Sequence, residues 1–121
     1  MTCVYYSGSV VAINLEADGP TAGDISPNGE EILIRTYNYI YYWKRNASTS
    51  LEETLSQTPV TMRNVRSEPQ GEAICWDRQG HGFYSLSEGP WQPLLYYARG
   101  PTRRAYTPPD NASRLHFSLT N

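Results

Sequence analysis

Four carboxylates are the side chains in this sequence best suited to chemistry. Asp24 precedes a turn-like run, Glu68 and Glu72 lie four positions apart, and Glu88 follows a strand-like segment. A pair of carboxylates can act as general acid and general base when the two groups flank a reacting bond. Their spacing along the chain does not fix their separation in space, so this role stays open.

Other catalytic arrangements are missing from the sequence. We find no Ser–His–Asp arrangement, no nucleophile elbow and no Walker motif. The two histidines, His81 and His116, are far apart and have no His or Cys partner at ligand spacing, which argues against zinc. Whether the protein is an enzyme is therefore uncertain, because no catalytic constellation is recognisable in this chain.

Composition limits the class of protein. The chain has 121 residues and a formal net charge of −2, which suits one small domain or part of a larger one and excludes a nucleic-acid-binding polycation. No apolar run approaches the roughly 20 residues of a transmembrane helix, and the first residues do not read as a signal peptide. Cys3 and Cys75 form either one disulfide or two separate thiols, and the second reading is favoured.

Ten Tyr, nine Gly and nine Pro favour strands and turns over helices. Ser50, with Glu53 three residues later, predicts a capping box and a short helix near 50–57. The alternating aromatic positions of 37–44 predict a half-buried strand rather than a ligand platform. The strands predicted from such patterns cover residues 3–6, 10–15, 23–25, 30–36, 37–44, 60–65, 71–76, 81–87 and 93–98.

Two parts of the chain look alike. An offset of 51 positions aligns Gly29 with Gly80 and Asn28 with Gln79. Further along, it aligns the predicted strand 30–36 with the predicted strand 81–87. The units cover about 20–45 and 60–99, and each ends in an aromatic strand. A period near 50 residues with three or four strands per unit is typical of propeller blades.

Specific motifs within these units resemble a known family. The runs Asp24-Ile25-Ser26-Pro27-Asn28-Gly29 and Ile34-Arg35-Thr36-Tyr37, together with Glu68-Pro69-Gln70-Gly71-Glu72-Ala73-Ile74, are similar to blades of six-bladed-type β-propeller proteins. The chain resembles the C-terminal part of such proteins, which are uncharacterised, often secreted and related to phytase-like and esterase-like propellers. The chain departs from the family at Asn28, where Asp is commoner, and at Trp91, which adds bulk to a plainer loop.

The resemblance implies an all-β fold, a partial β-propeller of about two to three blades. The propeller part would be 1–99, and 100–121 would be a polar tail with a closing strand at 114–119 that returns to the N-terminal hairpin. In such propellers the first strand of a blade lines the channel, and its carboxylates can hold Ca²⁺. Glu72 and Asp24 would be these ligands, although channel solvation is the simpler role for both.

The same resemblance gives the expected function. The chain would be a binding or scaffold module, a fragment of a larger β-propeller protein with an unknown ligand. The alternatives are a Ca²⁺-dependent phytase-like or esterase-like hydrolase, and a half-propeller that associates with itself. Partners would be the missing blades or another copy, with no nucleic acid. Family likeness and two sequons, at Asn46 and Asn111, favour an extracellular glycoprotein.

Overall fold

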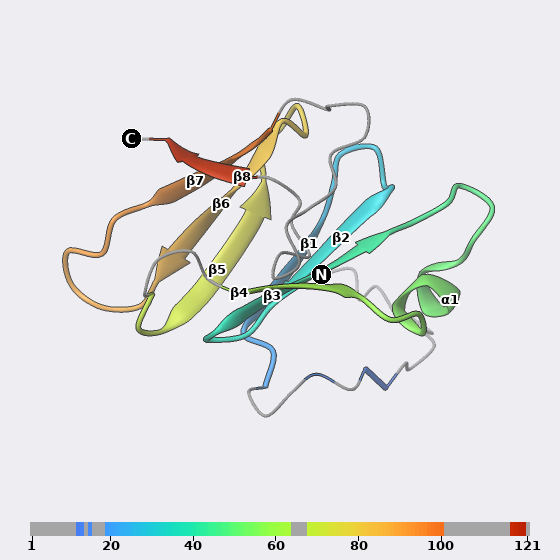
Figure 1. Cartoon of the computed structure of the whole chain (residues 1–121), viewed down its shortest axis with the longest axis horizontal. Coiled ribbons are helices and arrows are strands. Elements are labelled where there is room, and N and C mark those ends of the chain that lie inside the picture. Colours follow the sequence, from blue (N-terminus) through green and yellow to red (C-terminus); the bar gives the residue numbers. More distant parts are fainter. Residues whose placement is uncertain (1–11, 14, 16–18, 64–67, 101–116, 121) are drawn as a thin grey trace, which may run out of the picture.

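The computed structural model describes residues 12–13, 15, 19–63, 68–100 and 117–120, and it contains two four-stranded antiparallel sheets (Figure 1). In each sheet the strands follow one another in chain order. The first sheet consists of β1 (Ala22–Ile25), β2 (Glu31–Arg35), β3 (Tyr39–Lys44) and β4 (Val60–Arg63). The second consists of β5 (Gly71–Trp76), β6 (Gly82–Ser87), β7 (Leu95–Arg99) and β8 (Phe117–Thr120). The predicted all-β, antiparallel architecture is confirmed.

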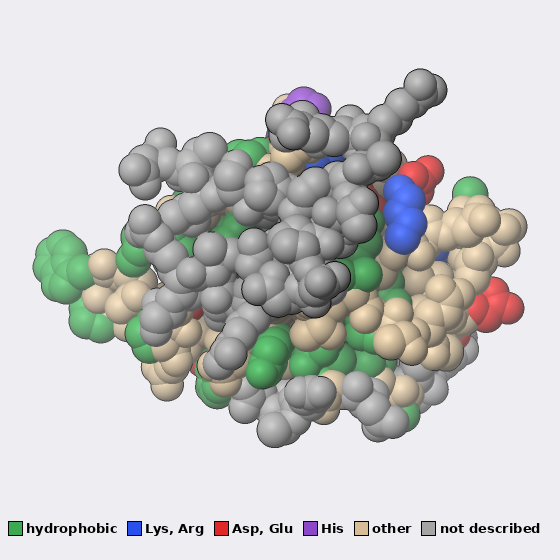
Figure 2. Space-filling view, in the orientation of Figure 1, with side chains coloured by type: hydrophobic (Ala, Val, Ile, Leu, Met, Phe, Trp, Pro, Cys, Tyr) green, Lys and Arg blue, Asp and Glu red, His purple; other side chains and the backbone are tan. Residues whose placement is uncertain are grey.

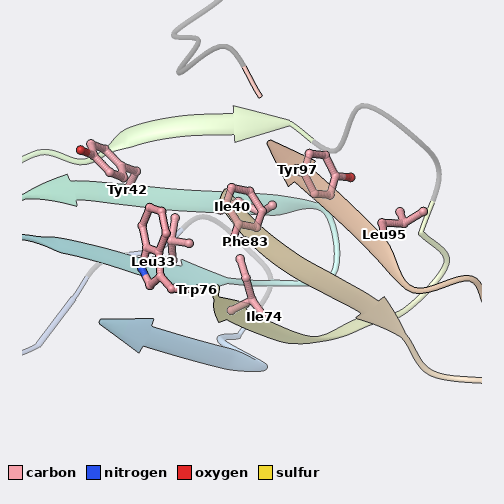
Figure 3. Packing of buried hydrophobic residues seen from close by; sticks show 8 residues of the cluster. All are labelled: Leu33, Ile40, Tyr42, Ile74, Trp76, Phe83, Leu95 and Tyr97. Carbon is pink, nitrogen blue, oxygen red and sulfur yellow. The ribbon is translucent and has the colours of Figure 1, made fainter. Parts of the chain in front are cut away.

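The two sheets pack face to face, with β1 and β2 of the first sheet against β5 of the second. Period-2 alternation sends every second side chain of β2, β3, β5, β6 and β7 into this interface. Figure 3 shows the resulting core, in which aromatic and branched side chains from both sheets point toward one another. Its buried members are Leu33, Ile40, Tyr42, Ile74, Trp76, Phe83, Leu95 and Tyr97. This shared core positions the first sheet against the second.

Aromatic rings give the core much of its buried area. Phe83 stacks on Tyr97 at 5.0 Å between ring centroids, and its ring meets the Trp76 ring edge-on at 6.0 Å. Such ring pairs contribute about 0.5–1.5 kcal/mol beyond the area that they bury. The three residues come from three neighbouring strands, so the ring contacts also fix the register of the second sheet.

The aromatic strand β3 is buried on both of its faces. Tyr41 and Trp43 form a second apolar cluster with Ile32, on the side of the first sheet that faces away from the second. Ile13 and Leu15 pack against this cluster, as does a residue of α1 (Leu51–Leu55), the short helix between β3 and β4. These rings are core side chains, as the alternation predicted, but the strand is buried on both faces and not half-buried, because a second apolar cluster covers the face that points away from the second sheet.

The two turns that the offset of 51 aligns have the same hydrogen bonds. The N–H of Gly29 donates to the Ser26 carbonyl at 2.8 Å, and the N–H of Gly80 donates to the Asp77 carbonyl at 3.1 Å. Both glycines have positive φ, 75° and 72°, a conformation that residues with a Cβ resist. The repeat predicted from the sequence is therefore present in the structure of these two turns.

The short helix begins as its capping box predicts. The Ser50 hydroxyl accepts from the Glu53 N–H, and the Glu53 carboxylate accepts from the Ser50 N–H, each at 3.1 Å. The helix ends at Leu55, two residues before the predicted limit at 57. Among the described residues, no helix is both long enough and apolar enough to cross a lipid bilayer.

The main differences from the sequence-based prediction concern β4, β8 and the start of β3. β4 pairs with β3 and belongs to the first sheet, although 60–99 was predicted as one unit. β8 pairs with β7 and forms the fourth strand of the second sheet, at Phe117–Thr120, where a closing strand was predicted at 114–119. The N-terminal hairpin with which that strand was expected to pair, 3–6 and 10–15, lies almost wholly outside the described residues. β3 starts at Tyr39 because Thr36 and Tyr39 close a turn, in which the Thr36 N–H donates to the Tyr39 carbonyl at 2.8 Å.

Candidate functional site

A buried polar cluster lies between the sheets and involves two of the motifs noted above. The Arg35 guanidinium is 0% exposed, lies 3.3 Å from a Glu68 carboxylate oxygen and donates to the Ser85 hydroxyl. Ser85 in turn donates to Glu68 at 2.7 Å, and the Arg35 Nε donates to the Thr36 carbonyl. A Cβ on Gly71 would overlap the guanidinium, so glycine provides its space. This enclosed cluster joins the sheets.

The predicted metal ligands are separate from each other. Asp24 uses both carboxylate oxygens locally, accepting from the Ile25 N–H at 2.9 Å and from the Trp76 N–H at 2.8 Å. Glu72 is exposed and accepts from the Tyr37 hydroxyl at 3.3 Å. Trp76 is four residues beyond Glu72 on β5, on the order of 13 Å along a strand. Asp24 thus links the sheets at one end of β5, and Glu72 lies near the other end.

The remaining predicted residues are also apart. Glu68 is enclosed in the Arg35 cluster, and Glu88 is exposed in the loop after β6. Within the described parts of the chain there is no group of three or more His, Cys, Asp and Glu side chains that could hold a metal ion. Asn46 lies in an exposed turn after β3, where a glycan would find room, whereas Asn111 falls outside the described residues.

A cleft of about 330 Å³ opens where the two equivalent turns come together. One wall comes from the turn between β1 and β2, and the other from the turn between β5 and β6. Polar residues dominate the lining, which consists of Ser26, Pro27, Asn28, Glu31, Lys44, Gln79, Gly80 and Arg99. Sequence analysis aligned Asn28 with Gln79 but did not identify the cleft, because only face-to-face packing of the sheets brings the two turns together.

Glu31, at the start of β2, is the charged residue most deeply buried in this cleft, with 4% of its surface exposed. It accepts from the Tyr42 hydroxyl at 2.7 Å and from an Arg99 guanidinium nitrogen at 2.6 Å. Burial alone would raise the pKa of Glu31, but these two hydrogen bonds and the nearby positive charges lower it below its ordinary value of 4.5. The carboxylate is therefore ionised at neutral pH and holds Arg99 in place.

Glu31 shifts the pKa of both of its hydrogen-bond partners. Burial and the Glu31 carboxylate raise the pKa of the Tyr42 hydroxyl well above its ordinary value, so Tyr42 stays a hydrogen-bond donor. The hydrogen bond to Glu31 raises the pKa of Arg99 as well. Arg99 also lies over the Trp76 ring, with 5.6 Å between the guanidinium carbon and the ring centroid. The cation is thus fixed by one carboxylate and one aromatic face.

Several hydrogen-bond donors of the cleft lining are unpaired within the described part of the chain. The Asn28 Oδ1 accepts from the Glu30 N–H at 3.1 Å and from the Ser26 hydroxyl at 2.7 Å, which turns the Asn28 amide NH₂ outward. Among the described residues this NH₂ group has no acceptor, and neither does the side-chain amide of Gln79 nor the Nη1 of Arg99. Lys44 adds a cation that pairs with Glu30 at the surface, 3.2 Å apart.

A single thiol is described. Cys75 lies on β5, is exposed and is not part of a disulfide, whereas Cys3 falls outside the described residues. The prediction of a strand thiol is confirmed for Cys75, but its side chain faces solvent rather than the core.

Comparison with known proteins identifies no relative: no family model, no curated protein and no solved structure matches this chain. The resemblance to β-propeller proteins stays a prediction that rests on the motifs themselves. Function is inferred below from the geometry of the two sheets and of the cleft between their turns.

Proposed function

We propose that this chain is a binding module built from two neighbouring blades of the β-propeller type. In this proposal the cleft between the two equivalent turns binds a small ligand that carries carboxylate oxygens. The observation that carries it is the set of unpaired hydrogen-bond donors in the cleft lining, which includes an arginine that Glu31 already fixes.

The blade assignment is supported by the way in which the sheets are built. A propeller blade is a four-stranded antiparallel sheet whose strands follow one another in chain order, and its neighbour packs on its face. Both sheets here have that strand order, and their first strands, β1 and β5, lie against each other. The offset of 51 that relates their turns is the length expected for one blade.

The chemistry of the ligand follows from the groups that remain open. Arg99 keeps its Nη1, and the side chains of Asn28 and Gln79, which carry amide donors, line the same cleft. Carboxylate oxygens accept several such bonds at once, and bonds in which one partner is charged are about twice as strong as neutral ones. Lys44 also lines the cleft, so the lining holds two cations and one carboxylate, Glu31, which an anionic ligand would meet.

Calorimetric titration with succinate tests this proposal. We expect saturable binding with a Kd on the order of 1 mM, and weaker binding at high salt because the ligand is an anion. Succinamide, the uncharged diamide of the same shape, should bind less well. Folded protein that shows no saturable binding of succinate would contradict the proposal.

Two variants locate the binding. Lys44→Gln removes a cation from the cleft and should weaken succinate binding several-fold. Arg78→Gln removes an exposed cation next to the cleft-lining residue Gln79, and it should leave the affinity unchanged. Equal effects from both variants would point to general charge attraction and would contradict a defined site.

The other functions suggested by the sequence receive less support. A Ca²⁺-dependent hydrolase would need clustered oxygen ligands, whereas Asp24 is occupied by two backbone N–H groups and Glu72 lies near the opposite end of β5. An extracellular location remains a proposal that rests on the motifs and on the exposed sequon at Asn46.

A further inference from the structure

The turn between β1 and β2 contains a dipeptide that can react with itself. Gly29 follows Asn28, and no other Asn in the sequence precedes a Gly. The backbone nitrogen after an Asn can attack the carbonyl carbon of the Asn side chain, and glycine hinders this attack least because it has no Cβ. Asn28 is exposed, so water reaches its side chain. Among the asparagines of this chain, Asn28 is therefore the one best suited to such a reaction.

The reaction is deamidation, and its only co-reactant is water. The Gly29 nitrogen loses its proton to hydroxide and forms a bond to the Asn28 Cγ, which closes a five-membered imide ring. The bond between Cγ and Nδ2 then breaks, and the Nδ2 group takes a proton from water and leaves as ammonia. Water opens the ring at Cγ to give Asp, or at the backbone carbonyl to give isoaspartate. The net change replaces ammonia by water and leaves a carboxylate.

The turn favours one partner of this reaction and restrains the other. The Asn28 Oδ1 accepts from the Ser26 hydroxyl at 2.7 Å and from the Glu30 N–H at 3.1 Å. This oxygen gains negative charge when the nitrogen adds to Cγ, and fixed donors stabilise such an oxyanion. The Gly29 N–H, however, donates to the Ser26 carbonyl at 2.8 Å. The nitrogen can attack only after this hydrogen bond opens, so the folded chain reacts more slowly than the unfolded chain.

The second sheet contains the same turn with a longer side chain. Gln79 precedes Gly80, whose N–H donates to the Asp77 carbonyl at 3.1 Å, and the two turn glycines have φ of 75° and 72°. Asn28 and Gln79 are both exposed, and both line the cleft. Attack on the Gln79 side chain would close a six-membered ring, which forms much more slowly. The repeat therefore provides an internal reference for the reactivity of Asn28.

Deamidation would change the chemistry of the cleft. The side-chain NH₂ of Asn28 is a hydrogen-bond donor, whereas the carboxylate that replaces it is an acceptor with a negative charge. The cleft lining would then hold two carboxylates, Glu31 and residue 28, against its two cations. Figure 2 shows few acidic or basic side chains among the described residues on that face of the molecule. One added charge is therefore a large local change, and it repels an anion.

We propose that Asn28 is a site of spontaneous deamidation, which adds a carboxylate to the cleft and weakens the binding of anionic ligands as the protein ages. The modification needs no ligand and is independent of the proposed function. Only its effect on binding rests on the proposed function, so the two claims are measured separately.

Peptide mapping by mass spectrometry follows the modification in the full chain at mildly alkaline pH. The peptide with Asn28 should convert to Asp and isoaspartate, faster at higher pH and faster in urea, and Gln79 should stay intact. Mass is the readout because Asp18-Gly19 can also form isoaspartate, but without a change of mass. Intact Asn28 after prolonged incubation of the folded chain, or equal conversion of Gln79, would overturn the proposal.

Two variants complete the test. Asn28→Gln gives the first turn the dipeptide of the second turn, so residue 28 should stay unmodified and the succinate affinity should not change with incubation time. Asn28→Asp carries one product of the reaction and should raise the succinate Kd several-fold, as incubation does for the unmodified chain. Circular dichroism checks that both variants are folded.

The possible failures are distinguishable. An Asn28→Asp chain that binds succinate as tightly as the unmodified chain would overturn the effect on the cleft. An unmodified chain that binds no succinate would contradict the proposed function, while the mass measurement would still decide whether Asn28 is the site of deamidation.

Discussion

At the scale of single residues, polar side chains hold the two sheets in register. Arg35 is fully buried and shares Glu68 with Ser85, and Asp24 accepts from a backbone N–H of the neighbouring sheet. A buried ion pair gives little net stability compared with apolar residues, but loss of one partner leaves an uncompensated charge. These groups therefore specify how the sheets meet more than they add to overall stability.

The Arg35 cluster gives a direct stability prediction. Glu68→Ala should lower the free energy of unfolding by about 3–5 kcal/mol, because it leaves the Arg35 charge buried without its counterion. Chemical denaturation with urea measures the change. Glu72→Ala serves as the matched control: its exposed carboxylate should change stability by less than about 0.5 kcal/mol. Similar losses in both variants would show that Glu68 has no special role.

Glu31 gives a prediction about pH. Its pKa is lowered in the folded protein, so its contribution to stability is complete above the ordinary value of 4.5 and is lost as the pH falls through the folded-state pKa. Glu31→Gln should therefore be less stable than the unmodified chain at pH of about 7, by about 1.5–3 kcal/mol, and this difference should shrink toward about pH 3.

Denaturation of both proteins at the two pH values measures this change. Glu88→Gln alters an exposed carboxylate with no side-chain partner among the described residues, and it should change stability little at either pH. A stability difference between Glu31→Gln and the unmodified chain that stays constant with pH would contradict the role given to Glu31.

At the scale of elements, the local signals in the sequence were reliable. The bounds of β5 agree with those predicted, and Ser50 and Glu53 form the capping box that their spacing indicated. Local hydrogen bonding decides such features, and it involves residues only a few positions apart. β4 was assigned to the wrong sheet because its pairing with β3 depends on how the helix between them redirects the chain.

The paired turns make a prediction at this scale. Gly29→Val should destabilise the protein by about 1 kcal/mol or more, because a β-branched residue resists the φ of 75° found there. The cost is conformational, since a Cβ at this position would meet only the Arg45 side chain at 3.7 Å. Thermal unfolding measures it. Gly19→Val, where a Cβ would meet nothing within 4 Å, should change the melting temperature little. An unchanged melting temperature in Gly29→Val would contradict the turn assignment.

At the scale of the whole molecule, the cleft arises because one sheet is repeated and the two equivalent turns come together. The offset of 51 could be read from the sequence, but the cleft could not be predicted from it. The two turns come together only when Leu33, Trp76 and their neighbours pack the sheets face to face. Non-local packing of this kind leaves no short motif. The same limit applies to Asp24, whose hydrogen bond from the N–H of Trp76 in the other sheet is not indicated by any short motif.

The central claim is that two turns 51 positions apart form one binding site, and a nuclear magnetic resonance titration with succinate tests it most directly. The side-chain amides of Asn28 and Gln79 and the backbone amide of Gly80 report on the two walls of the cleft. The account predicts that all three signals shift together and follow a single Kd. Shifts confined to one turn, or signals from the two turns that follow different Kd values, would contradict it.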